Sequence, residues 1–161
     1  MKKLLSFLIL FPAVVFGQQE SSLTDKVKSV LGFTAPTMYI EELKRLDNVF
    51  ILDTRERKEF DVSHLPNAIH VGDERVDMSL LGNVSKSDTI VVYCTVGYRS
   101  EKVAEKLQDA GYENAYNLFG GIFAWKNGDQ TVVDNTGKTT EKVHCYNKSW
   151  SVFLLNGEKV Y

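Results

Sequence analysis

Short apolar runs alternate with helical patterns through the middle of this chain. The runs are largely continuous in hydrophobicity, which is typical of strands buried on both faces of a sheet. They span residues 49–52, 68–71, 89–93 and 115–118. Between the last two, apolar residues at helical spacing predict a helix from Ser100 to Gly111, where the glycine ends it. This order of strand, helix and strand predicts an α/β fold with parallel strands and right-handed crossovers.

Two stretches before the first of these strands have apolar residues at helical spacing. We therefore expect a short amphipathic helix ending at Gly32 and a second helix after Pro36, each packing by one side only. Their apolar positions are Leu23, Val27, Val30 and Leu31 in the first, and Met38, Tyr39, Leu43 and Leu46 in the second.

Tight-turn signals replace helical patterns after Trp125. The segment 134–137 separates residues 131–133 from 140–146, and Asn156-Gly157 separates 152–155 from 158–161. Asn-Gly is a strong hairpin signal because both residues accept positive φ. Residues 129–161 are therefore expected to form a C-terminal β-hairpin appendage.

The first residues have the pattern of a secretory signal peptide. Met1-Lys2-Lys3 is positive, and residues 4–16 are almost wholly apolar. Thirteen helical residues cover about 20 Å, whereas the hydrocarbon core of a bilayer is about 30 Å thick. We expect cleavage after Gly17, export to the periplasm or the medium, a leader over 18–35, and no stable membrane insertion after cleavage.

Composition narrows the possible partners. The chain has 161 residues, 43% of them hydrophobic, and a net charge of -2, so one domain is expected and nucleic acid is not an expected partner.

Cys94 and Cys145 alone cannot form a disulfide framework. The histidines, among them His70 and His144, lack metal-ligand spacing with either cysteine, so no metal and no cofactor are expected. The oligomeric state stays open.

Cys94 is the candidate nucleophile. It follows the most β-branched strand and precedes a helix, so its sulfur is expected to face backbone N–H groups at a helix N-terminus. Gly97 allows the loop to curl, and Arg99 adds a positive charge at the rim. The alternative is an inert core cysteine, which is a common fate of free cysteine.

Three separated motifs resemble the rhodanese family. They are ILDTRERKEF at 51–60, HLPNAI at 64–69 and VVYCTVGYRSEKVAEKLQDAGYENAYNLFGGIFAW at 91–125. The resemblance implies a five-stranded, mainly parallel sheet flanked by helices over 36–128, with a first strand near 37–39. It also implies that Cys94 accepts sulfane sulfur from a donor such as thiosulfate and passes it to cyanide or a thiol. The residues expected to bind the substrate are Thr95, Val96, Gly97, Tyr98, Arg99 and Ser100.

The chain departs from the family pattern at several positions. Ser63 and Asn67 stand where the family has glycine, and both residues tolerate turns. Thr95 and Val96 follow the cysteine where many thiosulfate-using members have a basic residue, which makes thiosulfate a doubtful natural donor.

Other polar residues have structural or chemical interpretations. Asp53 and Arg55 are expected to form a buried pair that fixes neighbouring loops, although a catalytic role for them or for Glu59 is the alternative. Cys145 is expected to be a small buried residue; a resolving thiol is the competing interpretation.

Two other functions compete with sulfur transfer. A phosphatase on the same fold has one more residue between cysteine and arginine, whereas the spacing here is Cys-x4-Arg, sized for sulfur. A non-enzymatic sulfur carrier or partner-binding module is the second alternative, because a fold alone does not establish catalysis.

Overall fold

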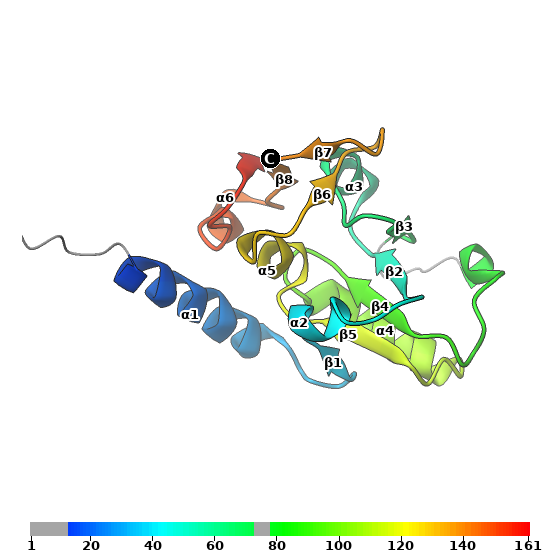
Figure 1. The fold of residues 1–161 in the computed structure, drawn as a ribbon. Helices are drawn as coiled ribbons and strands as arrows, with labels where there is room; N and C mark the ends of the chain where they lie inside the picture. The colour runs from blue at the N-terminus through cyan, green and yellow to red at the C-terminus, as the bar shows by residue number, and fades with distance from the viewer. Residues whose placement is uncertain (1–12, 73–77) are drawn as a thin grey trace, which may run out of the picture.

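A five-stranded parallel sheet forms the centre of the protein (Figure 1). The computed structural model describes residues 13–72 and 78–161. In spatial order the strands are β1 (Thr37–Met38), β5 (Ala115–Leu118), β4 (Ile90–Tyr93), β2 (Phe50–Asp53) and β3 (Ile69–His70). Every pairing is parallel. The predicted α/β sheet is therefore confirmed, including the first strand that only the family resemblance had placed.

The central strand β4 divides the hydrophobic core into two clusters. Ile90 and Val92 pack on one side with the apolar residues of α4 (Tyr98–Asp109). Val91 and Tyr93 pack on the other side with residues of α5 (Gly121–Asn127). Successive side chains of a strand point to opposite faces, so a continuous apolar run is what a sheet covered on both faces requires.

The remaining helices are α1 (Ala13–Val30), α2 (Ile40–Leu43), α3 (Arg57–Val62), the 3₁₀ turn η1 (Met78–Leu81) and α6 (Lys148–Ser151). The helix expected after Pro36 is shorter than predicted, because Met38 joins the sheet in β1 and the exposed Leu46 lies beyond the helix end. The first helix is longer than predicted, since α1 begins at Ala13.

The predicted signal peptide lies mostly outside the described residues. Its last part, from residue 13 onward, belongs to α1, which continues through the expected cleavage position at Gly17. Within 13–72 and 78–161, no helix is both long and apolar enough to cross a membrane.

The C-terminal segment contains one of the two predicted hairpins. β6 (Val132–Val133) pairs antiparallel with β7 (Thr139–Thr140). The second predicted hairpin is wrong: β9 (Glu158–Val160) pairs in parallel with β8 (Lys142–His144). Residues 152–155 do not form a strand, because the chain first turns through α6 and buries Leu154 in the core.

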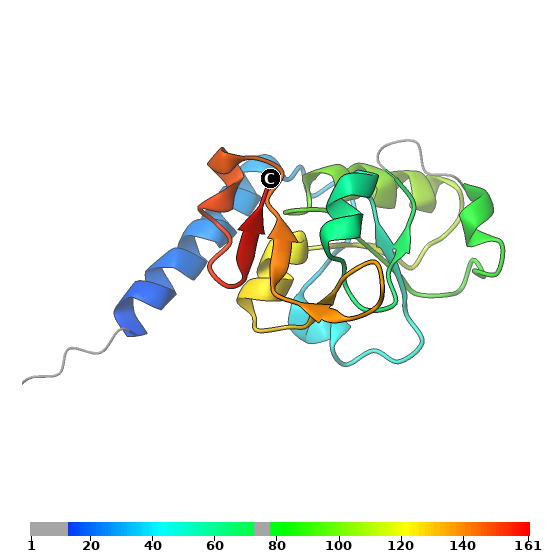
Figure 2. The same ribbon diagram turned by 90° about the horizontal axis from the view of Figure 1, so that it is seen from above.

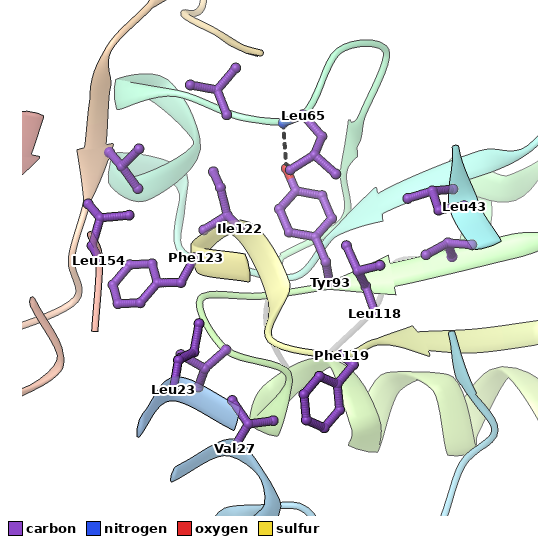
Figure 3. Packing of buried hydrophobic residues seen from close by; sticks show 14 of the residues in the cluster. Leu23, Val27, Leu43, Leu65, Tyr93, Leu118, Phe119, Ile122, Phe123 and Leu154 are labelled. Carbon is purple, nitrogen blue, oxygen red and sulfur yellow. Dashed lines mark hydrogen bonds between the residues drawn. The ribbon is translucent and has the colours of Figure 1, made fainter. Parts of the chain in front are cut away.

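Helix α1 and the C-terminal segment pack on the same side of the sheet. Leu23 and Val27 of α1 share a buried cluster with Phe123 of α5 and Leu154 of the C-terminal segment (Figure 3). In both ribbon views α6 lies beside α1 (Figures 1 and 2). The later part of α1 and the C-terminal segment thus pack together against the central domain.

Candidate active site at Cys94

Cys94 lies directly after the carboxyl end of β4, at the start of a tight loop that leads into α4. Its Sγ accepts a hydrogen bond of 3.2 Å from the backbone N–H of Gly97. Gly97 has φ 110° and precedes the first helical residue, Tyr98, so α4 begins two residues earlier than expected. The loop is therefore shorter than the sequence indicated. The sequence predicts several backbone N–H groups facing the sulfur. Among the described residues, the hydrogen bond to the sulfur comes from the N–H of Gly97.

The paired glycines before α5 hold this loop from the other side. The N–H groups of Ile122 and Phe123 donate to the carbonyls of Cys94 and Thr95 at 3.0 and 3.2 Å. A Cβ at Gly121 would lie 2.3 Å from the Cys94 carbonyl oxygen. Only glycine allows α5 to start this close to the cysteine.

Ser100 stabilises the loop through a buried hydrogen-bond network. Its hydroxyl donates to Asn117 Oδ1 at 2.7 Å, and Asn117 Nδ2 donates to the carbonyl of Gly97 at 3.1 Å. Ser100 and Asn117 are both fully buried. The network explains a structural role for Ser100, which the sequence placed among the substrate-binding residues.

Arg99 is paired with Glu59 of α3. Two hydrogen bonds of 2.8 and 2.9 Å join the guanidinium to the Glu59 carboxylate, and Arg99 Nη2 also donates to Thr95 Oγ1 at 3.0 Å. Burial disfavours both charges, but the hydrogen bonds between them raise the pKa of Arg99 and lower that of Glu59. Arg99 is expected from the sequence to place its charge at the rim. In the structure its guanidinium is largely occupied by hydrogen bonds to Glu59 and Thr95.

Asp53 and Arg55 form a second, fully buried pair. The Asp53 carboxylate accepts from Arg55 Nη2 at 2.7 Å and from the Tyr93 hydroxyl at 2.5 Å. Arg55 Nη2 also donates to the carbonyl of Ser63 at 2.6 Å. Burial opposes the Arg55 charge, yet the neighbouring Asp53 raises the pKa of this guanidinium above its usual value. These contacts tie β2, β4 and the loop after α3 together.

The turn after α3 tolerates the departures from glycine. Asn67 adopts φ 61°, a value that asparagine accepts more readily than most residues. His64 stacks on Phe60 with ring centroids 3.8 Å apart, and its backbone bridges to Val133 of β6. His64 therefore packs in the turn.

A cavity of about 330 Å³ opens over Cys94. Its lining includes five residues of the predicted loop, while Gly97 and Ser100 are not among the described residues that line it. The sequence missed three further lining residues, which lie far from the cysteine along the chain. In full, the lining consists of Cys94, Thr95, Val96, Tyr98, Arg99, Val30, Tyr146 and Trp150.

Cys145 directly follows β8 and is fully buried, and both cysteines are free thiols. Its backbone N–H donates to Val160 at 2.8 Å, which continues the β8 and β9 pairing. Burial raises the pKa of the Cys145 thiol. The described side chains contain no group of three or more His, Cys, Asp or Glu residues that could hold a metal ion.

Comparison with known proteins identifies the class. A family model described as the rhodanese-like domain matches residues 36–128. The rhodanese-like domain protein of Staphylococcus aureus superposes with a TM-score of 0.50 at 30% identity, over 56% of this chain and 90% of that structure. The chain belongs to the rhodanese-like domain family and has its α/β fold.

Two curated relatives are named for sulfur transfer. "Thiosulfate sulfurtransferase GlpE" of Coxiella burnetii is 29% identical over 85 residues, which cover 53% of this chain and 78% of the relative. "Adenylyltransferase and sulfurtransferase UBA4" of Candida albicans is 31% identical over 98 residues, covering 56% of this chain. The chain spans only 22% of the length of the latter relative.

Proposed function

We propose that this protein is a sulfurtransferase in which Cys94 carries sulfane sulfur as a persulfide. The observation that carries the proposal is the position of Cys94, whose Sγ accepts a hydrogen bond from the Gly97 N–H and lies at a cavity of about 330 Å³. A backbone N–H aimed at Sγ stabilises the negative charge of the attacking and departing Cys94 thiolate. The names of the GlpE and UBA4 relatives support the same chemistry.

The reaction has two half-reactions at one sulfur atom. The Cys94 thiolate attacks the sulfane sulfur of a donor, the donor's bond to that sulfur breaks, and the rest of the donor leaves with the electron pair. With thiosulfate the leaving group is sulfite. An acceptor thiolate or cyanide then attacks the outer sulfur of the persulfide, and the electron pair of the broken S–S bond returns to Cys94.

The alternative functions predict different behaviour. A carrier or partner-binding module would hold sulfur on Cys94 without repeated turnover, because it would lack an acceptor step at this site. An enzyme would convert many equivalents of donor and acceptor for each Cys94. Sulfur transfer is favoured because Cys94 lines a cavity that a small donor or acceptor can enter.

Intact-mass spectrometry tests the proposal. The purified protein is incubated with an excess of thiosulfate or inorganic tetrasulfide, and the mass gained is assigned to a cysteine by peptide mapping. We expect one added sulfur on Cys94, its release on addition of a thiol, and multiple turnovers. Cys94→Ser should lose the adduct, whereas the control Cys145→Ser should keep it. Sulfur uptake by the Cys94→Ser variant would contradict the assignment.

We also propose that the protein is exported. The support is the positive start of the chain at Lys2 and Lys3 and the apolar stretch 4–16 that follows. The full-length gene product is expressed, cell fractions are separated, and the N-terminus of the recovered protein is determined by mass spectrometry. We expect a mature protein outside the cytoplasm that begins at Gln18. An intact N-terminus on a cytoplasmic protein would contradict export.

A further inference from the structure

The pocket over Cys94 is completed by residues from outside the family domain. Val30 comes from the end of α1, Tyr146 follows β8, and Trp150 belongs to α6. The family match covers 36–128, so all three lie beyond it on one side or the other. Both views place α1 and α6 together on this side of the molecule (Figures 1 and 2).

The added walls are apolar and aromatic. Tyr146 and Trp150 face the cavity together with Val30, and the loop contributes Val96 and Tyr98. The polar lining residues Thr95 and Arg99 are already hydrogen-bonded to each other and to Glu59. The polar side chains that could bind an anionic donor are therefore already engaged within the protein. An apolar group, by contrast, can pack against several apolar and aromatic side chains of the lining.

Tyr146 covers the remaining positive charge. Its ring lies over the Arg99 guanidinium, with 5.1 Å between Cζ and the ring centroid. Only 19% of the Arg99 side chain is exposed. A cation stacked on an aromatic face is stabilised by the ring and withdrawn from solvent, which further reduces its attraction for an anion.

The two aromatic residues are held in place by backbone hydrogen bonds. The Tyr146 N–H donates to His144 Nδ1 at 3.1 Å, and the Trp150 N–H donates to Asn147 Oδ1 at 3.1 Å. Tyr146 has φ 62°, an uncommon conformation for tyrosine, and remains 49% exposed. Strained residues of this kind often mark functional sites. The exposed ring is available for contact with a ligand.

Trp150 connects the C-terminal segment to α1. Its ring lies 5.8 Å from that of Phe153, and the Lys26 ammonium lies 5.3 Å from its centroid. The wall is thus supported from both ends of the described chain. A volume of about 330 Å³ lies in the range of small-molecule pockets, which leaves room for a carbon skeleton as well as the reacting sulfur.

We infer that the sulfur acceptor is an organic thiol with a compact apolar or aromatic group, which packs against Tyr146 and Trp150 while its sulfur reaches Cys94. This inference rests on the proposed sulfurtransferase function and names its substrate class. The acceptor thiolate attacks the outer sulfur of the Cys94 persulfide. The S–S bond breaks toward Cys94, which leaves as a thiolate, and the organic persulfide is released. The reverse reaction loads Cys94 from the same organic persulfide.

Rates of persulfide discharge test the inference. Cys94 is first loaded with inorganic tetrasulfide, and loading is verified by intact mass. The persulfidated protein is then mixed with phenylmethanethiol or with the anionic 2-mercaptoethanesulfonate. The rate constant of each thiol with the protein is divided by the rate constant of the same thiol with a free cysteine persulfide. This division removes differences in the intrinsic reactivity of the two thiols. We expect discharge about tenfold faster with phenylmethanethiol, since burial of an apolar area equal to two methylene groups accounts for such a factor.

A matched pair of variants identifies the surface responsible. Tyr146→Asn removes the ring while retaining a residue that tolerates positive φ, and it uncovers Arg99. The ratio of the two rate constants should fall toward one. Val152→Ala removes an exposed apolar side chain from the same segment, outside the pocket lining, and should leave the ratio unchanged.

The outcomes separate the inference from the proposed function. A ratio near one in the unmodified protein, or an unchanged ratio in Tyr146→Asn, would overturn the substrate class while Cys94 still transfers sulfur. Failure of Cys94 to take up sulfur in the loading step would overturn the proposed function and the inference with it.

Discussion

Arg99 and Glu59 meet through two hydrogen bonds in a bidentate arrangement, with 2.8 Å between Nη1 and Oε2 and 2.9 Å between Nη2 and Oε1. The Glu59 side chain is fully buried. The pair joins α3 to the first turn of α4 and therefore stabilises the loop that carries Cys94. Arg99 is thus both a wall of the pocket and the partner of a buried carboxylate.

Removal of Arg99 should destabilise the protein as well as the site. Arg99→Ala leaves the Glu59 carboxylate buried without its main cation, and breaking such a pair costs about 3 kcal/mol. The free energy of unfolding, measured by urea denaturation, should fall by about this amount. The sequence alone predicts only a substrate-binding role for Arg99, because nothing local in the motif indicates its partner Glu59, 40 residues earlier.

The double variant Arg99→Ala with Glu59→Gln provides the control. The neutral glutamine removes the unpaired charge and can still accept the hydrogen bond that the Glu56 N–H now gives to Glu59 Oε2. We expect the double variant to be more stable than the single one. Equal stability of the two would show that Arg99 does not act by compensating Glu59.

Glu59 should also make stability depend on acid pH. Burial opposes its charge, but hydrogen bonds from Arg99 lower its pKa in the folded protein. In the unfolded chain a glutamate carboxyl has a pKa of about 4.3. The stabilising contribution is therefore fully present above that pH and is lost as pH falls through the folded pKa.

Comparison with Glu59→Gln isolates this contribution. The difference in free energy of unfolding between the unmodified protein and the variant is measured in urea at about pH 7 and about pH 3. Other carboxylates titrate in both proteins and cancel. We expect the difference to shrink at the lower pH. A difference that stays constant or grows would contradict the ion-pair assignment.

The central sheet was predictable because its signals are local. Continuous apolar runs ending at Asp53 and Tyr93 indicate buried strands, and their order along the chain indicates parallel pairing. The Asp134 to Gly137 turn was equally local and formed the predicted β6 and β7 hairpin. The turn at Asn156-Gly157 had the same signal, but β9 found its partner in β8 instead of the preceding segment. Leu154, in the segment expected to pair with it, is instead buried in the core.

Gly121 lies at a close approach between α5 and the active-site loop. It has φ 52°, and a Cβ there would lie 2.3 Å from the Cys94 carbonyl oxygen and 2.8 Å from the Thr95 carbonyl carbon. Gly121→Ala must therefore displace backbone at the reacting cysteine. We expect a loss of at least about 3 kcal/mol of stability together with loss of sulfur transfer.

Gly137→Ala is the matched control for the backbone effect. Gly137 has φ 81° in the β6 to β7 turn, and a Cβ there would have no neighbour within 4 Å. This variant meets only the conformational strain of an alanine at positive φ, about 1 kcal/mol. Urea denaturation and the persulfide assay should distinguish the two. Similar losses in both variants would contradict the importance of the close approach.

The pocket could be predicted only in part. The loop from Cys94 to Arg99 is contiguous, so its motif indicated most of the lining at once. Tyr146 and Trp150 belong to a different segment and carry no local signal, because single aromatic residues outside the core are common in proteins. Their place beside Cys94 depends on how the chain beyond 128 folds back over α5 and α1.

The two thiols should differ sharply in reactivity although neither is appreciably exposed. Cys94 is 1% and Cys145 0% exposed. Cys94 lines a cavity that a small reagent can enter, whereas burial raises the pKa of Cys145 and its backbone is paired with Val160. Alkylation of Cys145 thus requires local opening, which at a cost of about 3 kcal/mol makes it roughly a hundredfold slower.

Peptide mapping after brief alkylation at neutral pH measures both rates. We expect rapid labelling at Cys94 and slow labelling at Cys145, with the Cys145 rate alone rising steeply in mild urea because denaturant promotes opening. The unreduced sample serves as the control for disulfide formation and should give the same pattern, since both cysteines are free. A peptide linking Cys94 to Cys145, or faster labelling at Cys145, would instead support a resolving thiol, because a buried and inert cysteine can do neither.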